Sequence, residues 1–367
     1  MRETRSTAAV LLALALSVAV ALSSAHADES QGDGRITLEN VTEPAPISPD
    51  EPLLGSFSPG RAARYLDRAA LHWQKKHRCG TCHTNFSYLL ARPALAAVSP
   101  AAGEVRSFFE NLVEARWDTE GLRTGHSEVV ATATGLALND RSVSGRLHST
   151  TRKALDRMCG LQRQDGGWDW LKCGWPPMES DDHYGVTFAA VGIGSAPDGY
   201  ARSATAEKAL DGIRRYLQAN PPRGLHQRAM MVWASVEVDG ILTTAERRQV
   251  LRDLFALQRP DGGWAIAALL SPDHRRKDDL PQDLESSDGY ATGFVVYVAR
   301  RAGIPRDDDR LRRGVRWLKA NQRASGRWFT RSPTRDGKHY ISNAGTAYAV
   351  LALHACRELP GSDRIRL

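Results

Sequence analysis

Two cysteines and a histidine form the motif with the clearest chemistry in this sequence: Cys79, Cys82 and His83, spaced Cys-x-x-Cys-His. Two thiols at this spacing can bond to the two vinyl groups of a haem, and the histidine that follows can ligate its iron. The motif therefore predicts one covalently attached haem. A disulfide between the two cysteines and a zinc site are the alternatives, although no second Cys-x-x-Cys completes a zinc ribbon.

Three carboxylic acids form a second group within the segment ESDDHYG: Glu179, Asp181 and Asp182. A carboxyl group beside other carboxylates in an apolar cavity can stay protonated near neutral pH and then act as a general acid. The alternative is structural, because aspartate is a common capping residue at the start of a helix. A later segment, ESSDGYATG, aligns Asp288 with Asp182 and favours that alternative.

Several histidines lie at or near the expected starts of apolar helices, namely His83, His126, His183, His226 and His339. The partial positive charge of a helix N-terminus disfavours a charged imidazole, so neutral histidines that bind a metal or line a pocket are expected. We expect one of the four beyond His83 to be a second axial ligand of the haem iron, with Met158 and Met178 less favoured. An open sixth position would instead permit chemistry at the iron. A chance grouping among the 11 histidines is the remaining alternative.

The elements that position these residues are expected to be helices arranged in a repeat. Three segments are alike, LQRQDGGW, LQRPDGGW and NQRASGRW, and each follows a charged helix and precedes an apolar one. The first helix of each pair has one charged face and the second is apolar nearly all round, which predicts an outer ring around a buried inner ring. The predicted fold class is all-α, an α6/α6 barrel of about six helical hairpins. An open solenoid is the alternative, but it would need polar terminal caps.

The three segments resemble the Gln-Trp repeats of the squalene–hopene and oxidosqualene cyclases, whose α/α-toroid is shared with protein prenyltransferase β-subunits. Gln162–Trp168 and Gln258–Trp264 match the repeat in full, and Gln322–Trp328 lacks one glycine. The resemblance covers residues 60–357, about one toroid where the triterpene cyclases have two. It implies that the glutamine and tryptophan of each repeat tie neighbouring outer helices together. It implies the fold and not the reaction.

In the cyclases an Asp-x-Asp-Asp motif protonates an alkene through its middle aspartate. Asp181 stands at the corresponding position, with Glu179 in place of the first aspartate. The resemblance therefore implies a squalene–hopene-type cyclase, with Asp181 as general acid, as an alternative function. The zinc ligands of the prenyltransferases would require a cysteine near Asp288, and there is none. At Cys79–His83 alone, the chain resembles the c-type cytochromes, which implies haem c.

The N-terminus predicts export. Arg2 and Arg5 precede an apolar run that ends in Ala25-His26-Ala27, typical of a signal peptide cleaved after Ala27, with an uncleaved anchor as the alternative. The predicted organisation is a signal peptide (1–27), a proline-rich, extended or disordered leader (28–59), one toroid domain (60–357) and a C-terminal tail (358–367). The expected location is the periplasm, where haem c is attached in bacteria.

The charge distribution of the chain indicates which kinds of molecule it can bind. Cleavage would lower the formal net charge from +7 to +6, and the basic residues are dispersed among acidic ones. That pattern indicates solvated helix faces rather than a nucleic-acid groove, with contact at an anionic membrane surface possible and no transmembrane segment after cleavage. We therefore expect a haem c protein that acts in electron transfer, or in haem-dependent chemistry on an apolar ligand such as an isoprenoid. The expected partner is a redox protein or that apolar ligand, and a non-catalytic ligand-binding toroid is a further alternative.

Overall fold

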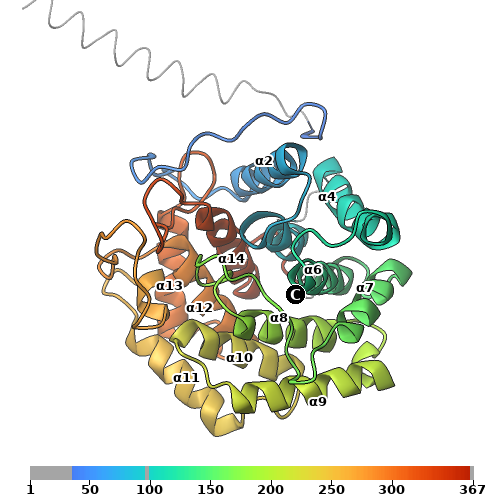
Figure 1. Ribbon diagram of the computed structural model, residues 1–367. Coiled ribbons are helices and arrows are strands. Elements are labelled where there is room, and N and C mark those ends of the chain that lie inside the picture. Colours follow the sequence, from blue (N-terminus) through green and yellow to red (C-terminus); the bar gives the residue numbers. More distant parts are fainter. Residues whose placement is uncertain (1–34, 96–98, 364–367) are drawn as a thin grey trace, which may run out of the picture. The chain divides into compact units, whose positions relative to one another are not determined.

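The computed structural model of this chain describes residues 35–95 and 99–363. These residues form helices joined by loops, with no β-strand beyond two isolated bridges (Figure 1). The all-α prediction is therefore confirmed. The predicted signal peptide lies outside the described residues, as do the first residues of the leader and the last residues of the tail.

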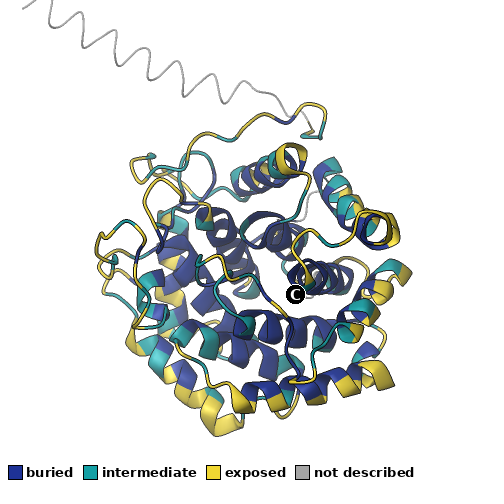
Figure 2. Cartoon of the chain, viewed as in Figure 1, coloured by how far each residue is buried: buried dark blue, intermediate teal, exposed yellow. Residues whose placement is uncertain are grey.

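One set of helices is buried on nearly every face, as Figure 2 shows. It comprises α3 (Ser87–Ala91), α6 (His126–Val143), α8 (Asp182–Ser195), α10 (Leu225–Glu237), α12 (Gly289–Arg301) and α14 (Ile341–Ala355). Each of these inner helices contacts the next along the chain, and α14 contacts α3, so the contacts run in a closed circuit.

A second set of helices lies outside this circuit and exposes one face to solvent (Figure 2). It comprises α2 (Pro59–His77), α4 (Pro100–Asn111), α7 (Ser149–Gly160), α9 (Ala204–Ala219), α11 (Thr244–Ala256) and α13 (Asp309–Ala320). Shorter helical turns complete the chain: η1 (Cys82–Phe86), η2 (Arg92–Leu95), η3 (Leu112–Arg116), α5 (Trp117–Thr119), η4 (Tyr200–Arg202) and η5 (Ile266–Leu269). The outer and inner helices alternate along the chain, as the helix pairs of the sequence predict.

The three repeated segments form nearly identical loops. In each loop the glutamine side chain donates one N–H to a carbonyl of its own loop and one to a backbone carbonyl of the next outer helix or of its N-cap residue. Gln162 reaches Ala209 O at 2.9 Å, Gln258 reaches Arg310 O at 2.8 Å, and Gln322 reaches Ser58 O at 3.0 Å. The expectation that the repeats tie neighbouring outer helices together is confirmed for the glutamines.

The tryptophan of each repeat has a role of its own. Trp168, Trp264 and Trp328 are fully buried, and each indole N–H donates at 2.7 Å to a carbonyl of the outer helix that precedes it. The glycine before Trp328 shows why the loop requires this residue type. Gly326 has a φ of +96°, and a Cβ there would lie 2.3 Å from Arg61 O on α2.

Side chains fill the space inside the circuit of inner helices. The ring of His226 stacks on Phe294 at 4.5 Å, and Tyr348 packs edge-on against both Tyr290 and Phe294. A gap of about 10 Å³ beside Tyr184 and Tyr348 has room for no more than one water molecule. The middle of the circuit is thus a packed core.

The leader is ordered from Thr37 onward and belongs to the same compact unit as the helices. It is mostly extended, as predicted, but it is fastened to the loop of the third repeat. Glu51 accepts from Arg327 Nε at 2.6 Å, and Leu54 N–H donates to Gln322 O at 2.7 Å. This part of the leader is therefore not a disordered linker.

Candidate functional site

Cys79, Cys82 and His83 lie on the wall of a cavity of about 380 Å³. The wall is built from η1, from the first residues of α6 and α14, and from the loop that precedes α8. The cavity therefore lies at the end of the circuit where the inner helices begin. Its volume falls in the range typical of small-molecule and cofactor sites.

Tight packing around η1 fixes the Cys-x-x-Cys-His segment. Asn85 donates its side-chain N–H to Ala70 O on α2 at 3.0 Å, and Ser87 Oγ donates to Cys82 O at 2.7 Å. Gly80, between the two cysteines, lies against the Phe109 ring, and a Cβ there would come within 2.5 Å of it. Contacts with α2 and with Phe109 on α4 thus fix the position of the segment.

The His83 imidazole is oriented by a chain of polar groups. Its Nδ1 lies 3.0 Å from Thr84 Oγ1, which accepts from Asn343 Nδ2 at 3.0 Å, and Tyr65 donates its hydroxyl proton to Asn343 Oδ1. Burial lowers the pKa of His83 to about 4, and the nearby charge of His77 adds to the effect. The imidazole is therefore neutral at physiological pH, as a metal ligand must be. Among the described residues, Nε2 has no hydrogen-bond partner.

The cysteines of the cavity are free thiols. Burial raises the pKa of Cys82 well above its ordinary value, and the nearby charge of Glu179 raises it further. A third thiol, Cys173, lines the same cavity, and burial raises its pKa as well. A redox-active Cys-x-x-Cys needs a thiol with a lowered pKa, so these surroundings do not favour that alternative.

The three acids grouped by the sequence occupy three different surroundings. Glu179 lines the cavity that holds Cys82 and His83, and burial raises its pKa. Asp181 caps α8, accepting from Tyr184 N–H at 3.3 Å, and its other oxygen accepts from Gln227 at 2.7 Å beside a separate cavity of about 270 Å³.

Asp182 forms ion pairs instead. Its carboxylate lies 3.0 Å from Arg163 and 3.2 Å from Lys172, and it accepts from Trp170 N–H at 3.1 Å. The helix-capping role predicted for Asp182 therefore falls to Asp181, one residue earlier. Asp182 is the first residue of α8 and ties that helix to the loop of the repeat.

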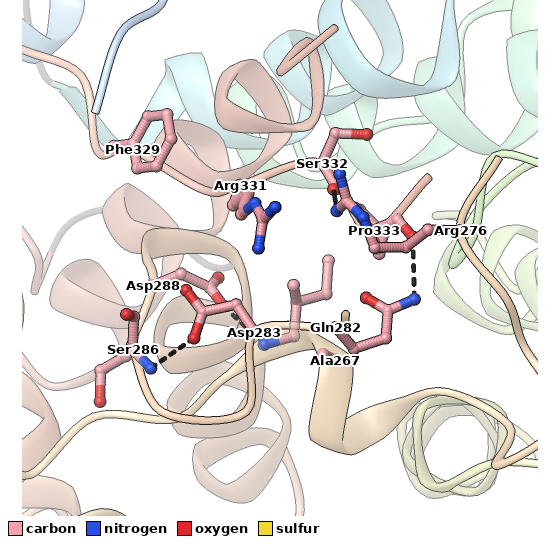
Figure 3. A pocket seen from close by; sticks show the side chains of 12 residues that line it. Ala267, Arg276, Gln282, Asp283, Ser286, Asp288, Phe329, Arg331, Ser332 and Pro333 are labelled. Atoms are coloured by element: carbon pink, nitrogen blue, oxygen red, sulfur yellow. Dashed lines mark hydrogen bonds between the residues drawn. The ribbon is translucent and has the colours of Figure 1, made fainter. Parts of the chain in front are cut away.

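The aligned residue Asp288 has the capping role in the next repeat. It accepts from Ala291 N–H at 2.9 Å and from Ile266 N–H at 2.5 Å, and burial raises its pKa to about 7. It lines a pocket of about 40 Å³ together with Arg276 and Arg331 (Figure 3). Both arginines pair with Asp336 rather than with Asp288. The pocket is too small for a substrate, and the role of Asp288 is structural.

The four other histidines do lie at or just before the starts of inner helices, but none of them is in the wall of the 380 Å³ cavity. Both ring nitrogens of His339 meet backbone N–H groups, at 3.0 and 3.3 Å. His226 Nε2 lies 2.9 Å from the Tyr290 hydroxyl, and His126 Nδ1 lies 3.8 Å from Asp169. His183 is buried, and neither of its nitrogens has a hydrogen-bond partner among the residues that the structure describes. That one of them is a second iron ligand stays a prediction.

Sequence reasoning missed several residues of the cavity wall. Trp73 and Tyr340 contact the His83 ring, and Trp175, Glu128 and Cys173 line other parts of the wall. These residues come from segments up to 267 positions apart in the chain, Trp73 to Tyr340. No local pattern marks them, because only the closed circuit brings these segments together.

No protein-family model matches this sequence, and no curated protein matches it either. Within residues 35–95 and 99–363, no cluster of three or more histidine, cysteine or acidic side chains is arranged to hold a metal ion. In the same ranges, no helix has the length and apolar character needed to cross a bilayer.

Proposed function

We propose that this protein is an exported α/α-toroid of the cyclase and prenyltransferase type that carries one haem c on Cys79 and Cys82 and acts in electron transfer. One observation carries the proposal: Cys79, Cys82 and His83 all line one cavity of about 380 Å³, and both cysteines are free thiols. The closed circuit of inner helices and the repeated loops support the toroid assignment. Residues 60–357 would form the toroid, and the predicted signal peptide would direct it to the periplasm.

The residues present fit the cofactor. Cys79 and Cys82 would hold it by thioether bonds, and the neutral imidazole of His83 would ligate the iron through Nε2, with Nδ1 donating to Thr84. Trp73 and Tyr340 pack against the His83 ring. When bound, the haem supplies one-electron exchange at its iron. We assign no residue to the sixth iron position.

We favour electron transfer over chemistry on an apolar ligand inside the toroid. The inner helices enclose a packed aromatic core, and the gap beside Tyr184 and Tyr348 is only about 10 Å³. The cyclase alternative would instead have to hold its substrate in the cavity of about 270 Å³ beside Asp181. In addition, both oxygens of Asp181 are engaged as hydrogen-bond acceptors, one in the cap of α8 and one with Gln227.

The test is covalent haem in protein made by a host that is competent for export and haem maturation. The purified protein should be red, with a haem band that survives denaturing electrophoresis. Cys82→Ala should lose that band, whereas Cys159→Ala should keep it, because Cys159 lies outside the cavity wall. Colourless wild-type protein, or equal haem in both variants, would overturn the proposal and leave a non-catalytic ligand-binding toroid as the simpler function.

A further inference from the structure

Two glutamates line the cavity of the proposed haem, and only one of them is held by other groups. Glu128 accepts from Trp117 Nε1 at 2.7 Å and from Arg123 N–H at 3.3 Å, and Arg116 lies 3.5 Å away. In the part of the chain that the structure describes, the Glu179 carboxyl has neither a hydrogen-bond donor nor an ion-pair partner. The Glu179 carboxyl is thus the unpaired acid of the cavity.

A hydrogen-bonded loop holds Glu179 at this position. Its backbone N–H donates to Trp175 O at 3.0 Å, and Trp175 N–H donates back to Glu179 O at 3.2 Å. The carbonyl of the preceding residue accepts from Trp170 Nε1 at 2.6 Å. Lys277 Nζ donates to Cys173 O at 2.9 Å and so fastens the other end of the loop. The loop therefore keeps the carboxyl at the cavity wall.

The charged and titratable groups around Glu179 come from every side of the cavity. Besides Glu179, the charged or titratable residues that line the cavity are Cys79, Cys82, His83, Glu128, Cys173, Lys338 and Tyr340. They come from η1 and the residues just before it, from α6, from the loop of Glu179 and from the segment before α14. Haem attachment would convert Cys79 and Cys82 into thioethers, which do not titrate. Glu128 is fixed by its donors, and Lys338 is exposed, with its ammonium 5.8 Å from the centre of the Tyr340 ring. Among the side chains of the cavity wall, Glu179 and Cys173 then remain as the groups that can exchange a proton.

We propose that Glu179 takes up one proton from solvent when the cofactor of this cavity gains one electron, and releases it when the electron leaves. The inference rests on the proposed haem function. The electron comes from a redox partner and the proton from water, so the net charge of the cavity stays constant. The physical reason is Coulombic: gaining an electron removes one positive charge near the carboxylate, and in a partly buried site this favours the protonated acid.

The test is the midpoint potential of the haem-loaded protein as a function of pH, measured by spectroelectrochemistry between pH 5 and 9. Over part of this range the wild-type potential should fall by up to about 59 mV per pH unit, the value for one proton per electron. Glu179→Gln should remove the slope, and Glu179→Asp should keep a slope at a shifted pH. Cys173→Ala is the matched control, because it removes the other titratable group of the same loop and should leave the slope unchanged.

The outcomes separate this inference from the function on which it rests. A wild-type potential that does not depend on pH, a slope that persists in Glu179→Gln, or a slope that disappears in Cys173→Ala overturns the role of Glu179 alone. Protein without covalent haem overturns the proposed function, and the role of Glu179 with it. Loss of the slope only in Glu179→Gln, with an unchanged haem content, supports the inference.

Discussion

Gln322 and Ser58 exchange two hydrogen bonds across 264 residues of sequence: Ser58 N–H donates to Gln322 Oε1 at 2.7 Å, and Gln322 Nε2 donates to Ser58 O at 3.0 Å. Ser58 also caps α2, because its hydroxyl accepts from Arg61 N–H. The last repeat loop is thereby tied to the first outer helix. The same glutamine that joins neighbouring outer helices elsewhere closes the circuit here.

Gln322→Ala should destabilise the fold by about 2 kcal/mol, because the part-buried backbone of Ser58 loses two hydrogen bonds. Gly326→Ala should cost more, since the new Cβ would meet Arg61 O in a left-handed backbone conformation. Urea unfolding monitored by tryptophan fluorescence measures both changes. Gln249→Ala is the control, because Gln249 is exposed and bonds only within α11. Equal midpoints for Gln322→Ala and the control would contradict the closing role.

A buried ion pair fastens the first inner helix. Asp67 on α2 accepts from Arg92 Nε at 2.8 Å, from the Tyr88 hydroxyl at 2.6 Å and from Ser99 Oγ at 2.9 Å. Asp67→Ala should cost about 3–5 kcal/mol of unfolding free energy, because it leaves the Arg92 charge buried without this partner. The double variant Asp67→Ala/Arg92→Met should lose less than the sum of the two single variants. Additive losses in urea unfolding would show that the two side chains are not coupled.

The helix order, the alternation of outer and inner helices and the role of the repeat glutamines could be predicted from sequence because they depend on local patterns. Nearly continuous apolar composition marks α8 and α12, and the Gln162 and Gln258 loops have the same side-chain hydrogen bonds. The cavity wall could not be predicted in the same way. Trp73 and Tyr340 meet only after the circuit closes.

The acids illustrate the same limit at shorter range. Three carboxyl groups within four residues form one group in the sequence, but the structure separates them. Glu179 lines a cavity, Asp181 caps α8, and Asp182 pairs with two cationic side chains. The difference follows from the backbone. The chain turns from a hairpin bridge at Glu179 into α8 within three residues, so successive side chains point in different directions.

Acid should destabilise the fold through its buried histidines. Burial lowers the pKa of His226 to about 3 in the folded protein, against an ordinary value of 6.5. As pH falls below about 6.5, the unfolded chain binds this proton while the folded protein does not until about pH 3, so the unfolding free energy should fall by up to about 1.4 kcal/mol per pH unit for this group. His226→Phe should reduce that slope in urea unfolding at pH 4 to 7. Phe294→Leu disturbs the same ring stack without removing a titratable group and should keep the slope. Identical slopes in both variants would contradict the assignment.

The cyclase alternative makes an opposite prediction about Asp181. If its carboxylate only caps α8 and accepts from Gln227, then Asp181→Ala should lower stability by about 1 kcal/mol. Incubation of wild type and Asp181→Asn with squalene, followed by gas chromatography with mass spectrometry, should give no cyclic product in either case. A product formed by wild type and lost in Asp181→Asn would establish cyclase chemistry. It would also show that Asp181 does more than cap α8.

His83 separates attachment of the cofactor from ligation of its iron. In His83→Ala the thiols of Cys79 and Cys82 are intact, so covalent haem should persist on a denaturing gel. The visible absorption spectrum should nevertheless change, because the iron loses its imidazole ligand, and added imidazole should restore it in part. Thr84→Val should change the spectrum less but shift the midpoint potential, because His83 Nδ1 loses the oxygen that orients it. His126→Ala is the matched control: this histidine also opens an inner helix, but it lies outside the cavity wall and should leave spectrum and potential unchanged. If His126→Ala changed the spectrum as much as His83→Ala does, the iron would have a ligand that the cavity wall does not provide.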